Sequence, residues 1–361
     1  MQIATLRSHL AHHFKKWWEL EWMPWLDWIQ LEVTSRCNAT CTYCPRTVYH
    51  SQWENRDLSL DTFERLLPVF SKTKTVHLQG WGEPFLYKYF FDIVARVKKA
   101  GCKVGTTTNG MLLNRQEINR LVASGIDRVA FSLTGIGEKN DTVRKGTDFR
   151  KILQAISDLT AEKKALHVET PMVNVAYLLL RSHLSDIDDI VPILAELGIQ
   201  HVIISTLDFV PCKDLQKEQL MPRDEREYRE LKSFLDRLVM AGKQAGLSIS
   251  YRLVSPGKRN GNCTENIERS LFVSADGSVS PCVFTNIPAF EALHMIRGCE
   301  HEYRQLTFGT VAETSIPAIW LSRRYATFRD SFDSTLHPFC QECPKLYKSW
   351  DSNEGRKNSN G

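Results

Sequence analysis

The chain has 361 residues, of which 42% are hydrophobic and 24% charged, and its formal net charge is +4. This composition is typical of a globular protein with one large core or two domains, and the charge is too small to indicate nucleic-acid binding. The sequence has no apolar run of about 18 residues and no signal-peptide pattern. Its 10 cysteines therefore favour a reducing, cytoplasmic setting, where cysteines act as metal ligands more often than as disulfides.

Residues 1–27 form a tryptophan-rich segment. Five of the nine tryptophans lie between Trp17 and Trp28, close to a basic patch of His12, His13, Lys15 and Lys16. Apolar residues at helical spacing predict an amphipathic helix here, and tryptophan beside lysine suits a membrane interface. A helix that packs against the rest of the protein or against a second copy is the alternative, so a peripheral membrane contact stays open.

Residues 28–210 alternate between strand and helix patterns. We expect strands over 29–33, 75–79, 103–108, 128–133, 167–177 and 201–207, and helices over 61–71, 89–100, 114–123, 149–164 and 187–197. Strand–helix repeats with short connections predict a parallel sheet with helices outside it. Local pattern alone does not distinguish a flat, doubly wound sheet from a curved partial barrel.

The rest of the chain divides into three parts. Residues 211–256 are charged and predict a helical bridge, with a helix over 224–245. Residues 257–350 contain Asp276-Gly277, which predicts a tight hairpin turn, and then a helical pattern that leads to Cys340. Residues 351–361 are polar, and we expect them to be a disordered tail.

The most specific chemical signal is a loop of three cysteines, Cys37, Cys41 and Cys44, with the spacing C-x₃-C-x₂-C. Three thiolates leave one iron of a 4Fe–4S cube without a protein ligand, and an open metal position indicates chemistry. On spacing alone, two alternatives stay open. One is a partial zinc knuckle with His50 as fourth ligand, and the other is chance in a cysteine-rich chain.

The loop resembles that of the radical S-adenosylmethionine (SAM) superfamily, in which an aromatic residue such as Tyr43 precedes the third cysteine. Later segments resemble the same family. They are 79–84 (QGWGEP), similar to a Gly-Gly-Glu-Pro motif with Trp81 in place of the first glycine; 106–110 (TTTNG); 131–134 (FSLT); and 140–146 (NDTVRKG). They lie at or after the ends of three successive expected strands, in the order that the family shows.

The resemblance implies an α/β fold with a partial (β/α)6 TIM-like barrel over 28–210 and its chemistry at the C-terminal ends of the strands. It implies that Cys37, Cys41 and Cys44 ligate a 4Fe–4S cluster whose open iron binds SAM. The reduced cluster then cleaves SAM to a 5′-deoxyadenosyl radical. The implied SAM contacts are Tyr43, Gly82, Glu83, Asn109, Ser132 and Arg144.

A second cysteine set consists of Cys263, Cys282, Cys340 and Cys343. Its layout around the expected hairpin resembles the SPASM and shorter twitch extensions, which carry auxiliary 4Fe–4S clusters. Because no cysteine follows Cys343, we expect one auxiliary cluster with four thiolates over a domain at 257–350. A structural Cys₄ zinc site is the alternative. Cys299 is a spare ligand, whereas Cys102 and Cys212 are expected to be buried or free thiols.

These features predict a radical SAM oxidoreductase or maturase. A fully ligated auxiliary cluster suits electron transfer, which favours a net oxidation or a bond-forming modification. Only 36 residues precede Cys37, which favours a small molecule, a lipid-like compound or a peptide presented by a partner as the substrate. We expect a reductant such as flavodoxin or ferredoxin and no nucleic acid. The competing class is a non-enzymatic iron–sulfur or zinc scaffold, or an electron-transfer protein.

Overall fold

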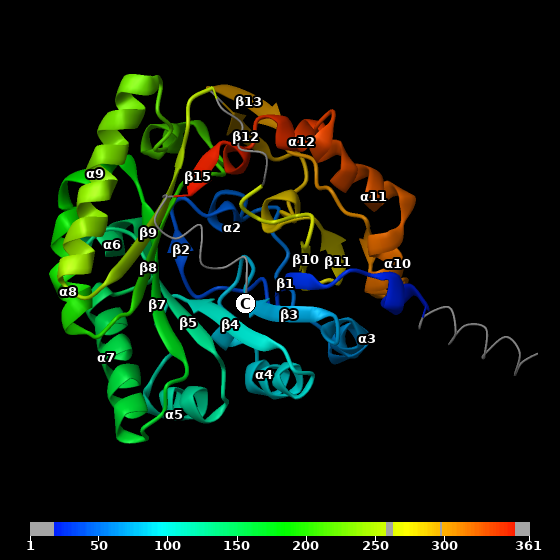
Figure 1. The fold of residues 1–361 in the computed structure, drawn as a ribbon, viewed down its shortest axis with the longest axis horizontal. Coiled ribbons are helices and arrows are strands. Elements are labelled where there is room, and N and C mark those ends of the chain that lie inside the picture. The colour runs from blue at the N-terminus through cyan, green and yellow to red at the C-terminus, as the bar shows by residue number, and fades with distance from the viewer. Residues whose placement is uncertain (1–17, 258–262, 297, 351–361) are drawn as a thin grey trace, which may run out of the picture.

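The computed structural model describes residues 18–257, 263–296 and 298–350; the expectations for the segment 1–17 and for the tail 351–361 lie outside them. The described chain is organised by one sheet of eleven strands in the order β14-β11-β10-β1-β3-β4-β5-β7-β8-β9-β15. Figure 1 shows these strands following an arc, with helices along its outer side.

The strands of the large sheet are β1 (Leu26–Leu31), β3 (Thr73–Leu78), β4 (Lys103–Thr108), β5 (Arg128–Leu133), β7 (Met172–Leu179), β8 (His201–Thr206), β9 (Ser248–Val254), β10 (Ser270–Val273), β11 (Ser278–Ser280), β14 (Gly309–Thr310) and β15 (Lys348–Trp350). Two small ribbons pair β2 (Thr40–Cys41) with β6 (Arg144–Lys145) and β12 (Leu293–Ile296) with β13 (Cys299–Glu302).

The α-helices are α2 (Pro45–Val48), α3 (Leu60–Phe70), α4 (Phe90–Lys99), α5 (Arg115–Ala123), α6 (Glu138–Val143), α7 (Phe149–Ala165), α8 (Ile190–Glu196), α9 (Glu225–Gln244), α10 (Ile316–Leu321), α11 (Arg323–Asp330) and α12 (Pro338–Gln341). Short 3-10 helices lie at η1 (Pro84–Leu86), η2 (Arg181–Asp189), η3 (Lys213–Glu218), η4 (Val283–Thr285), η5 (Ser331–Asp333) and η6 (Pro344–Leu346).

The six expected strands of the barrel are β1, β3, β4, β5, β7 and β8, and each pairs in parallel with the next. In the described part of the chain the sheet ends at β14 on one side and β15 on the other, so it stays open. The α/β fold with a partial TIM-like barrel is thereby confirmed. Parallel strands point their C-terminal ends to one edge, and the loops that carry the family motifs leave from that edge.

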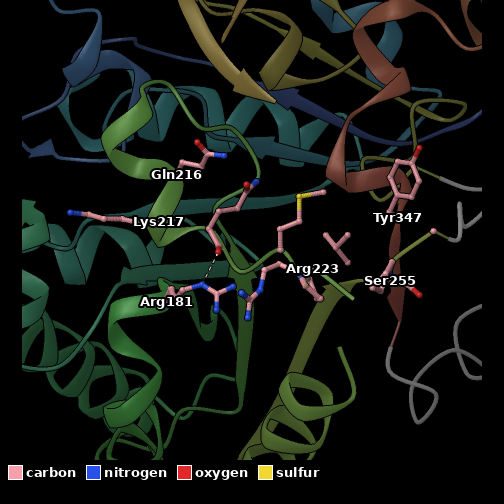
Figure 2. A pocket seen from close by; sticks show the side chains of 12 residues that line it. Arg181, Gln216, Lys217, Arg223, Ser255 and Tyr347 are labelled. Atoms are coloured by element: carbon pink, nitrogen blue, oxygen red, sulfur yellow. Dashed lines mark hydrogen bonds between the residues drawn. The ribbon is translucent and has the colours of Figure 1, made fainter. Parts of the chain in front are cut away.

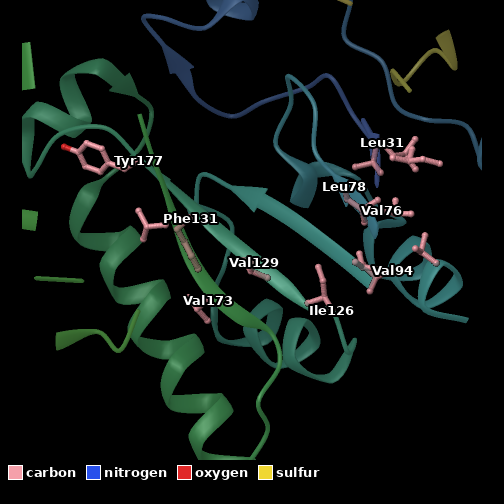
Figure 3. Packing of buried hydrophobic residues seen from close by; sticks show 14 of the residues in the cluster. Leu31, Val76, Leu78, Val94, Ile126, Val129, Phe131, Val173 and Tyr177 are labelled. Carbon is pink, nitrogen blue, oxygen red and sulfur yellow. The ribbon is translucent and has the colours of Figure 1, made fainter. Parts of the chain in front are cut away.

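The two faces of the sheet differ in chemistry. Val76, Leu78 and Phe131 are fully buried against the outer helices, and Figure 3 shows them in one layer with neighbouring apolar side chains. Strand side chains alternate between faces, so His77 and Thr107 point to the inner side, where the ring nitrogen Nε2 of His77 lies 3.2 Å from the Thr107 hydroxyl. The outer face therefore supplies the core, whereas the inner face offers polar side chains to the lumen.

Several strand ends are shifted, as in β1, which covers Leu26–Leu31 rather than 29–33, and β3, which covers Thr73–Leu78 rather than 75–79. Three elements differ more. Strand β9 (Ser248–Val254) lies within the bridge that we expected to be helical. Its side chains alternate in burial from Ser248 to Leu253, a period of two that the long helix before it obscured. Strand β7 begins at Met172 rather than at residue 167, because Pro171 has no N–H for the ladder. The expected helix over 187–197 is a 3-10 segment, η2, followed by the shorter α8.

The C-terminal part of the chain extends the same sheet. The hairpin expected at Asp276-Gly277 is confirmed, since β10 and β11 pair antiparallel around it. Strand β10 also lies parallel to β1, with Ile29 opposite Leu271. The second cysteine set is therefore attached to the edge of the barrel sheet. No helix of the described residues is long and apolar enough to cross a membrane.

Because Leu78 is fully buried in the outer layer, we expect Leu78→Ala to leave a cavity and to lower the free energy of unfolding by about 2–5 kcal/mol. The matched control is Leu166→Ala, at an exposed leucine after α7, which should change it by less than about 0.5 kcal/mol. Anaerobic urea unfolding measures both. Equal effects of the two substitutions would contradict this packing.

Candidate active site: two groups of converging thiols

The three cysteines of the first loop face one another after strand β1. Cys41 lies in β2 and Cys44 is the residue directly before α2. Burial, together with the nearby sulfurs of Cys41 and Cys37, raises the pKa of the Cys44 thiol to about 12. The pKa of Cys37 is raised by burial in the same way. Buried thiols that repel one another as thiolates are stabilised when a cationic metal centre lies among them.

The loop is held by bonds that sequence reasoning missed. The backbone N–H of Ala39 donates to Cys37 Sγ over 3.4 Å, and the N–H of Arg46 donates to Cys44. The guanidinium of Arg46 donates to the carbonyls of Cys37, at 3.0 Å, and of Ala39, at 2.8 Å. The bonds from the N–H groups of Ala39 and Arg46 to sulfur are of the kind that accompanies iron–sulfur ligation.

Glu83 lies at the centre of the motif that follows β3. Its carboxylate is buried and accepts hydrogen bonds from the Thr108 hydroxyl and from the backbone N–H of Asn109, both over 2.7 Å. Burial raises its pKa, although these bonds oppose the shift. The Asn109 side chain then donates to Asn38 Oδ1 at 2.7 Å, beside Cys37. Glu83 and Asn109, both predicted from the sequence, are thus brought to the cysteine loop.

The glycines of this motif allow a close approach of backbones. A Cβ on Gly82 would lie 2.2 Å from the Thr34 carbonyl oxygen and 2.5 Å from that of Arg36. Trp81, which replaces a family glycine, packs its ring against Trp53 and Phe284, and its Nε1 donates to the Asn286 carbonyl over 3.0 Å. The substitution therefore gives a contact with the C-terminal region.

Arg144 and Tyr43 meet on the other side of the loop. Arg144 Nη1 donates to the Tyr43 hydroxyl over 2.6 Å, and Arg144 pairs with Cys41 in the β2–β6 ribbon. Its Nε is buried and has no hydrogen-bond partner among the described residues. Ser132 lies half-buried on β5, on the inner side of the sheet. An unsatisfied buried guanidinium nitrogen fits an anionic group of a bound ligand.

The four cysteines of the second set also converge. The pKa of Cys340 is raised by burial and by the neighbouring sulfurs of Cys343, Cys282 and Cys263. Backbone N–H groups of Glu265 and Lys345 donate to Cys263 and Cys343, two residues before each donor. The arrangement repeats that of Cys37 and Cys44, so both sets carry N–H to sulfur bonds from the residue two positions on.

The other three cysteines lie apart from this second set. Cys299 is exposed on β13, so the structure does not bring it to the four thiols. Cys102 is buried, and its thiol lies 3.2 Å from the carbonyl oxygens of Phe70 and Thr73. Cys212 is half-buried before η3.

A buried ion-pair network adjoins the second set, and it too was missed from the sequence. Lys345 contacts Glu265 at 2.5 Å and Asp208 at 3.4 Å, and Lys348 contacts Asp208 at 2.7 Å. Burial lowers the pKa of Lys345, but the carboxylates of Glu265 and Asp208 outweigh it and raise the pKa overall. The only local sign of this network in the sequence was Lys345, directly after the C-x₂-C-P run. It did not indicate that Glu265 and Asp208 are its partners.

Two cavities border this region. The larger, of about 790 Å³, is lined by Arg181, Lys217, Arg223 and Tyr347 among others, and Figure 2 shows Arg181 and Lys217 on one side with Ser255 and Tyr347 on the other. The smaller, of about 50 Å³, includes Cys343 in its lining. Both are lined by Gln219 and Met221. The larger cavity is therefore a candidate entrance for a substrate.

The residues present fit the cofactors that the sequence implies. Among the described residues, no group of three or more His, Cys, Asp and Glu side chains is arranged to hold a single metal ion. The thiolates of a 4Fe–4S cube bind separate irons and lie further apart than those around one zinc. Converging thiols, the open Nε of Arg144 and the close approach at Gly82 fit a cluster with bound SAM at the first loop.

Family models match both parts of the chain. The radical SAM superfamily model matches residues 31–191, and the model of SPASM, an iron–sulfur cluster-binding domain, matches residues 263–344. The chain therefore belongs to the radical SAM superfamily and carries a SPASM domain. It is a SAM-cleaving radical enzyme whose cofactors are SAM, a 4Fe–4S cluster and additional iron–sulfur at the SPASM domain.

Among curated relatives, the chain is 26% identical over 328 residues to the tungsten-containing aldehyde ferredoxin oxidoreductase cofactor-modifying protein of Pyrococcus furiosus, covering 88% of this chain and 87% of that protein. It is 25% identical over 287 residues to a probable GTP 3′,8-cyclase of Methanocaldococcus jannaschii, covering 76% of this chain and 90% of that protein.

Solved structures show the same fold. Streptococcus suis SuiB bound to S-adenosylmethionine aligns with a TM-score of 0.65 at 14% identity, covering 94% of this chain and 76% of SuiB. Native anSMEcpe with bound AdoMet and the Cp18Cys peptide aligns with a TM-score of 0.62 at 20% identity, covering 90% of this chain and 88% of that one. At these identities the likeness is one of fold.

If Glu83 binds the SAM ammonium, Glu83→Gln removes a charge-assisted contact worth roughly 1.5–3 kcal/mol. SAM should then bind about ten- to a hundredfold more weakly, with iron content unchanged, as measured by equilibrium dialysis. The matched control is Thr108→Val, which removes the hydroxyl donor to the same carboxylate but keeps its charge. An equal loss in both variants, or no loss in Glu83→Gln, would show that the charge does not bind SAM.

Proposed function

We propose that this radical SAM enzyme carries out a net oxidation or a bond-forming modification of its substrate with the help of one auxiliary 4Fe–4S cluster. Cys37, Cys41 and Cys44 hold the SAM cluster in this proposal. The auxiliary cluster is held by Cys263, Cys282, Cys340 and Cys343. The observation that carries the proposal is the convergence of three thiols in one group and four in the other.

The chain's own residues have separate roles toward SAM in this proposal. Glu83, fixed by Thr108 and Asn109, accepts from the SAM ammonium. Arg144, whose Nε has no hydrogen-bond partner among the described residues, donates to the SAM carboxylate. The Tyr43 hydroxyl accepts from Arg144 Nη1 and so fixes the guanidinium. Asn109 and Ser132 would contact bound SAM from the inner face, while Gly82 allows the close backbone packing that places Glu83. These assignments are supported by the burial and hydrogen bonds of the described side chains.

When bound, the two clusters supply an electron for SAM cleavage and an acceptor for the second electron of a net oxidation. A four-thiolate cluster has no open iron, so electron transfer suits it better than substrate binding. The initial electron comes from a reductant such as flavodoxin or ferredoxin. The chain's contribution is to position the substrate between the two sites and to exclude water.

A maturase role is supported by the relative from Pyrococcus furiosus, whose name describes a cofactor-modifying protein. GTP 3′,8-cyclases among the relatives and a peptide in one aligned structure keep small-molecule and peptide substrates both open. A lipid-like substrate is the third class. Assay of SAM cleavage with each class of compound, reading hydrogen transfer into 5′-deoxyadenosine, separates the three.

Two clusters predict about eight irons per chain after anaerobic reconstitution. Joint substitution of Cys37, Cys41 and Cys44 by Ala should remove about half of the iron and all SAM cleavage. The control Cys299→Ala, at an exposed cysteine, should keep both. Iron and sulfide analysis with an anaerobic cleavage assay measures these outcomes. About four irons with zinc in the other site would contradict the auxiliary cluster, and full iron without cleavage would favour an electron-transfer scaffold.

We also propose a lipid surface as a partner. Trp18, Trp22 and Trp25 are 44%, 66% and 50% exposed, and the rings of Trp18 and Trp22 stack at 5.4 Å. Exposed indole rings partition into the interface of a bilayer. Such a contact would bring the enzyme to a lipid-like substrate.

The full chain should therefore float with vesicles of phosphatidylserine and phosphatidylcholine. Joint substitution of Trp22 and Trp25 by Ala should reduce flotation at least severalfold without changing SAM cleavage. Leu321→Ala removes an exposed apolar side chain elsewhere and should change nothing. Failure of the full chain to float would exclude this partner.

A further inference from the structure

Four charged side chains are enclosed beside the auxiliary thiols. The side chains of Lys345, Asp208, Glu265 and Lys348 are only 15%, 5%, 20% and 3% exposed, and ion pairs join them in a row. Asp208 follows β8, Glu265 lies two residues after Cys263, and Lys345 lies two residues after Cys343. The row therefore runs from the barrel sheet to two segments that carry thiols.

Lys345 is the cation of this row that adjoins the sulfurs. Its backbone N–H donates to Cys343, and its ammonium interacts electrostatically with Cys343 and Cys282. The ammonium also lies 4.9 Å from the centre of the Phe284 ring, on the segment that follows Cys282. Lys348 joins the row through Asp208, so one more ion pair separates it from the sulfurs than separates Lys345.

Glu265 is the counterpart of opposite sign. Its carboxylate interacts with Cys282 and Cys263, where it disfavours additional negative charge, and its backbone N–H donates to Cys263. Lys345 and Glu265 thus form one ion pair beside the thiol group, and both act on Cys282. Asp208 also acts on Cys343, and Arg252 on Cys263. Buried charges are screened little by water or salt, so each acts strongly on a neighbouring charge change.

Stability alone does not account for this row. Desolvation of buried ion pairs offsets much of their attraction, and apolar residues of similar volume often stabilise a protein equally well. Reduction of an iron–sulfur cluster, by contrast, adds one negative charge to the space that these thiols surround. Charges near a cluster and hydrogen bonds to its sulfurs are established determinants of its reduction potential.

We propose that the enclosed ammonium of Lys345 sets the reduction potential of the auxiliary cluster by stabilising its reduced form. The proposal rests on the proposed function in one respect, that Cys263, Cys282, Cys340 and Cys343 hold a 4Fe–4S cluster. Lys345 is a positioning residue here and contacts no substrate. Its charge makes the cluster a better acceptor of one electron.

The test uses the full chain in which Cys37, Cys41 and Cys44 are replaced by Ala, so that the auxiliary cluster alone gives the measured signal. In this background Lys345→Met should lower the midpoint potential in a dithionite titration followed by electron paramagnetic resonance. We expect the ratio of reduced to oxidised cluster at a fixed potential to fall about tenfold, which is about 59 mV for one electron. Lys345→Arg keeps the charge and should restore most of the potential.

Two further variants separate charge from structural loosening. Glu265→Gln should raise the midpoint potential, opposite to Lys345→Met, and Lys348→Met should shift it less than Lys345→Met does. Iron near four per chain in each variant shows that the cluster is intact. If Lys345→Met loses its iron, the opposite shift in Glu265→Gln and the retained potential in Lys345→Arg still support the proposal.

An unchanged potential in Lys345→Met with full iron, or shifts of the same sign in Lys345→Met and Glu265→Gln, would overturn the role of Lys345. A background protein that binds zinc instead of iron would overturn the cluster assignment itself and the proposal with it. These outcomes distinguish a wrong role for Lys345 from a wrong cluster assignment, which would contradict the proposed function.

Discussion

The carboxylate of Glu83 is the constraint on which the first site depends. It is buried and bound by the Thr108 hydroxyl and the Asn109 N–H, and so it fixes the loop after β3 against the end of β4. The Asn109 side chain in turn donates to Asn38, so the residue next to Cys37 is also held in place. The position of the three thiols relative to the proposed SAM contacts therefore follows from one buried acid, which costs free energy to desolvate unless it is bound in this way.

The two thiol groups are held to one another by the sheet and by two side chains. Strand β10 lies parallel to β1, so the hairpin before Cys282 and the loop before Cys37 leave neighbouring strands. Glu32, at the end of β1, accepts from the N–H of Trp81 at 2.7 Å and of Ala275 at 3.1 Å, and burial raises its pKa to about 7. Trp81 adds its bond to the Asn286 carbonyl. A rigid separation of this kind suits electron transfer between a substrate and an auxiliary cluster.

The sequence predicted the elements whose pattern is local. Strands β4 and β5 and the periodic helix α9 lie within one residue of their expected bounds, and the spacing of Cys37, Cys41 and Cys44 indicated their grouping. Contacts that depend on tertiary folding were not predictable. The ribbon of β2 and β6 has two residues on each side, too few for a pattern, and Asp208 meets Lys345 only because β8 and the C-terminal segment converge. Trp81 looked like a departure from a motif, and its role became clear only from its partner, Asn286.

The central claim is that one cluster has an open iron for SAM and the other has none. Mössbauer spectroscopy of ⁵⁷Fe-reconstituted protein, recorded before and after addition of SAM, tests it most directly. The account predicts that about one iron in eight changes its signal, because SAM binds a single open site in the cluster of Cys37, Cys41 and Cys44. A change at irons of both clusters, or at none, would contradict it.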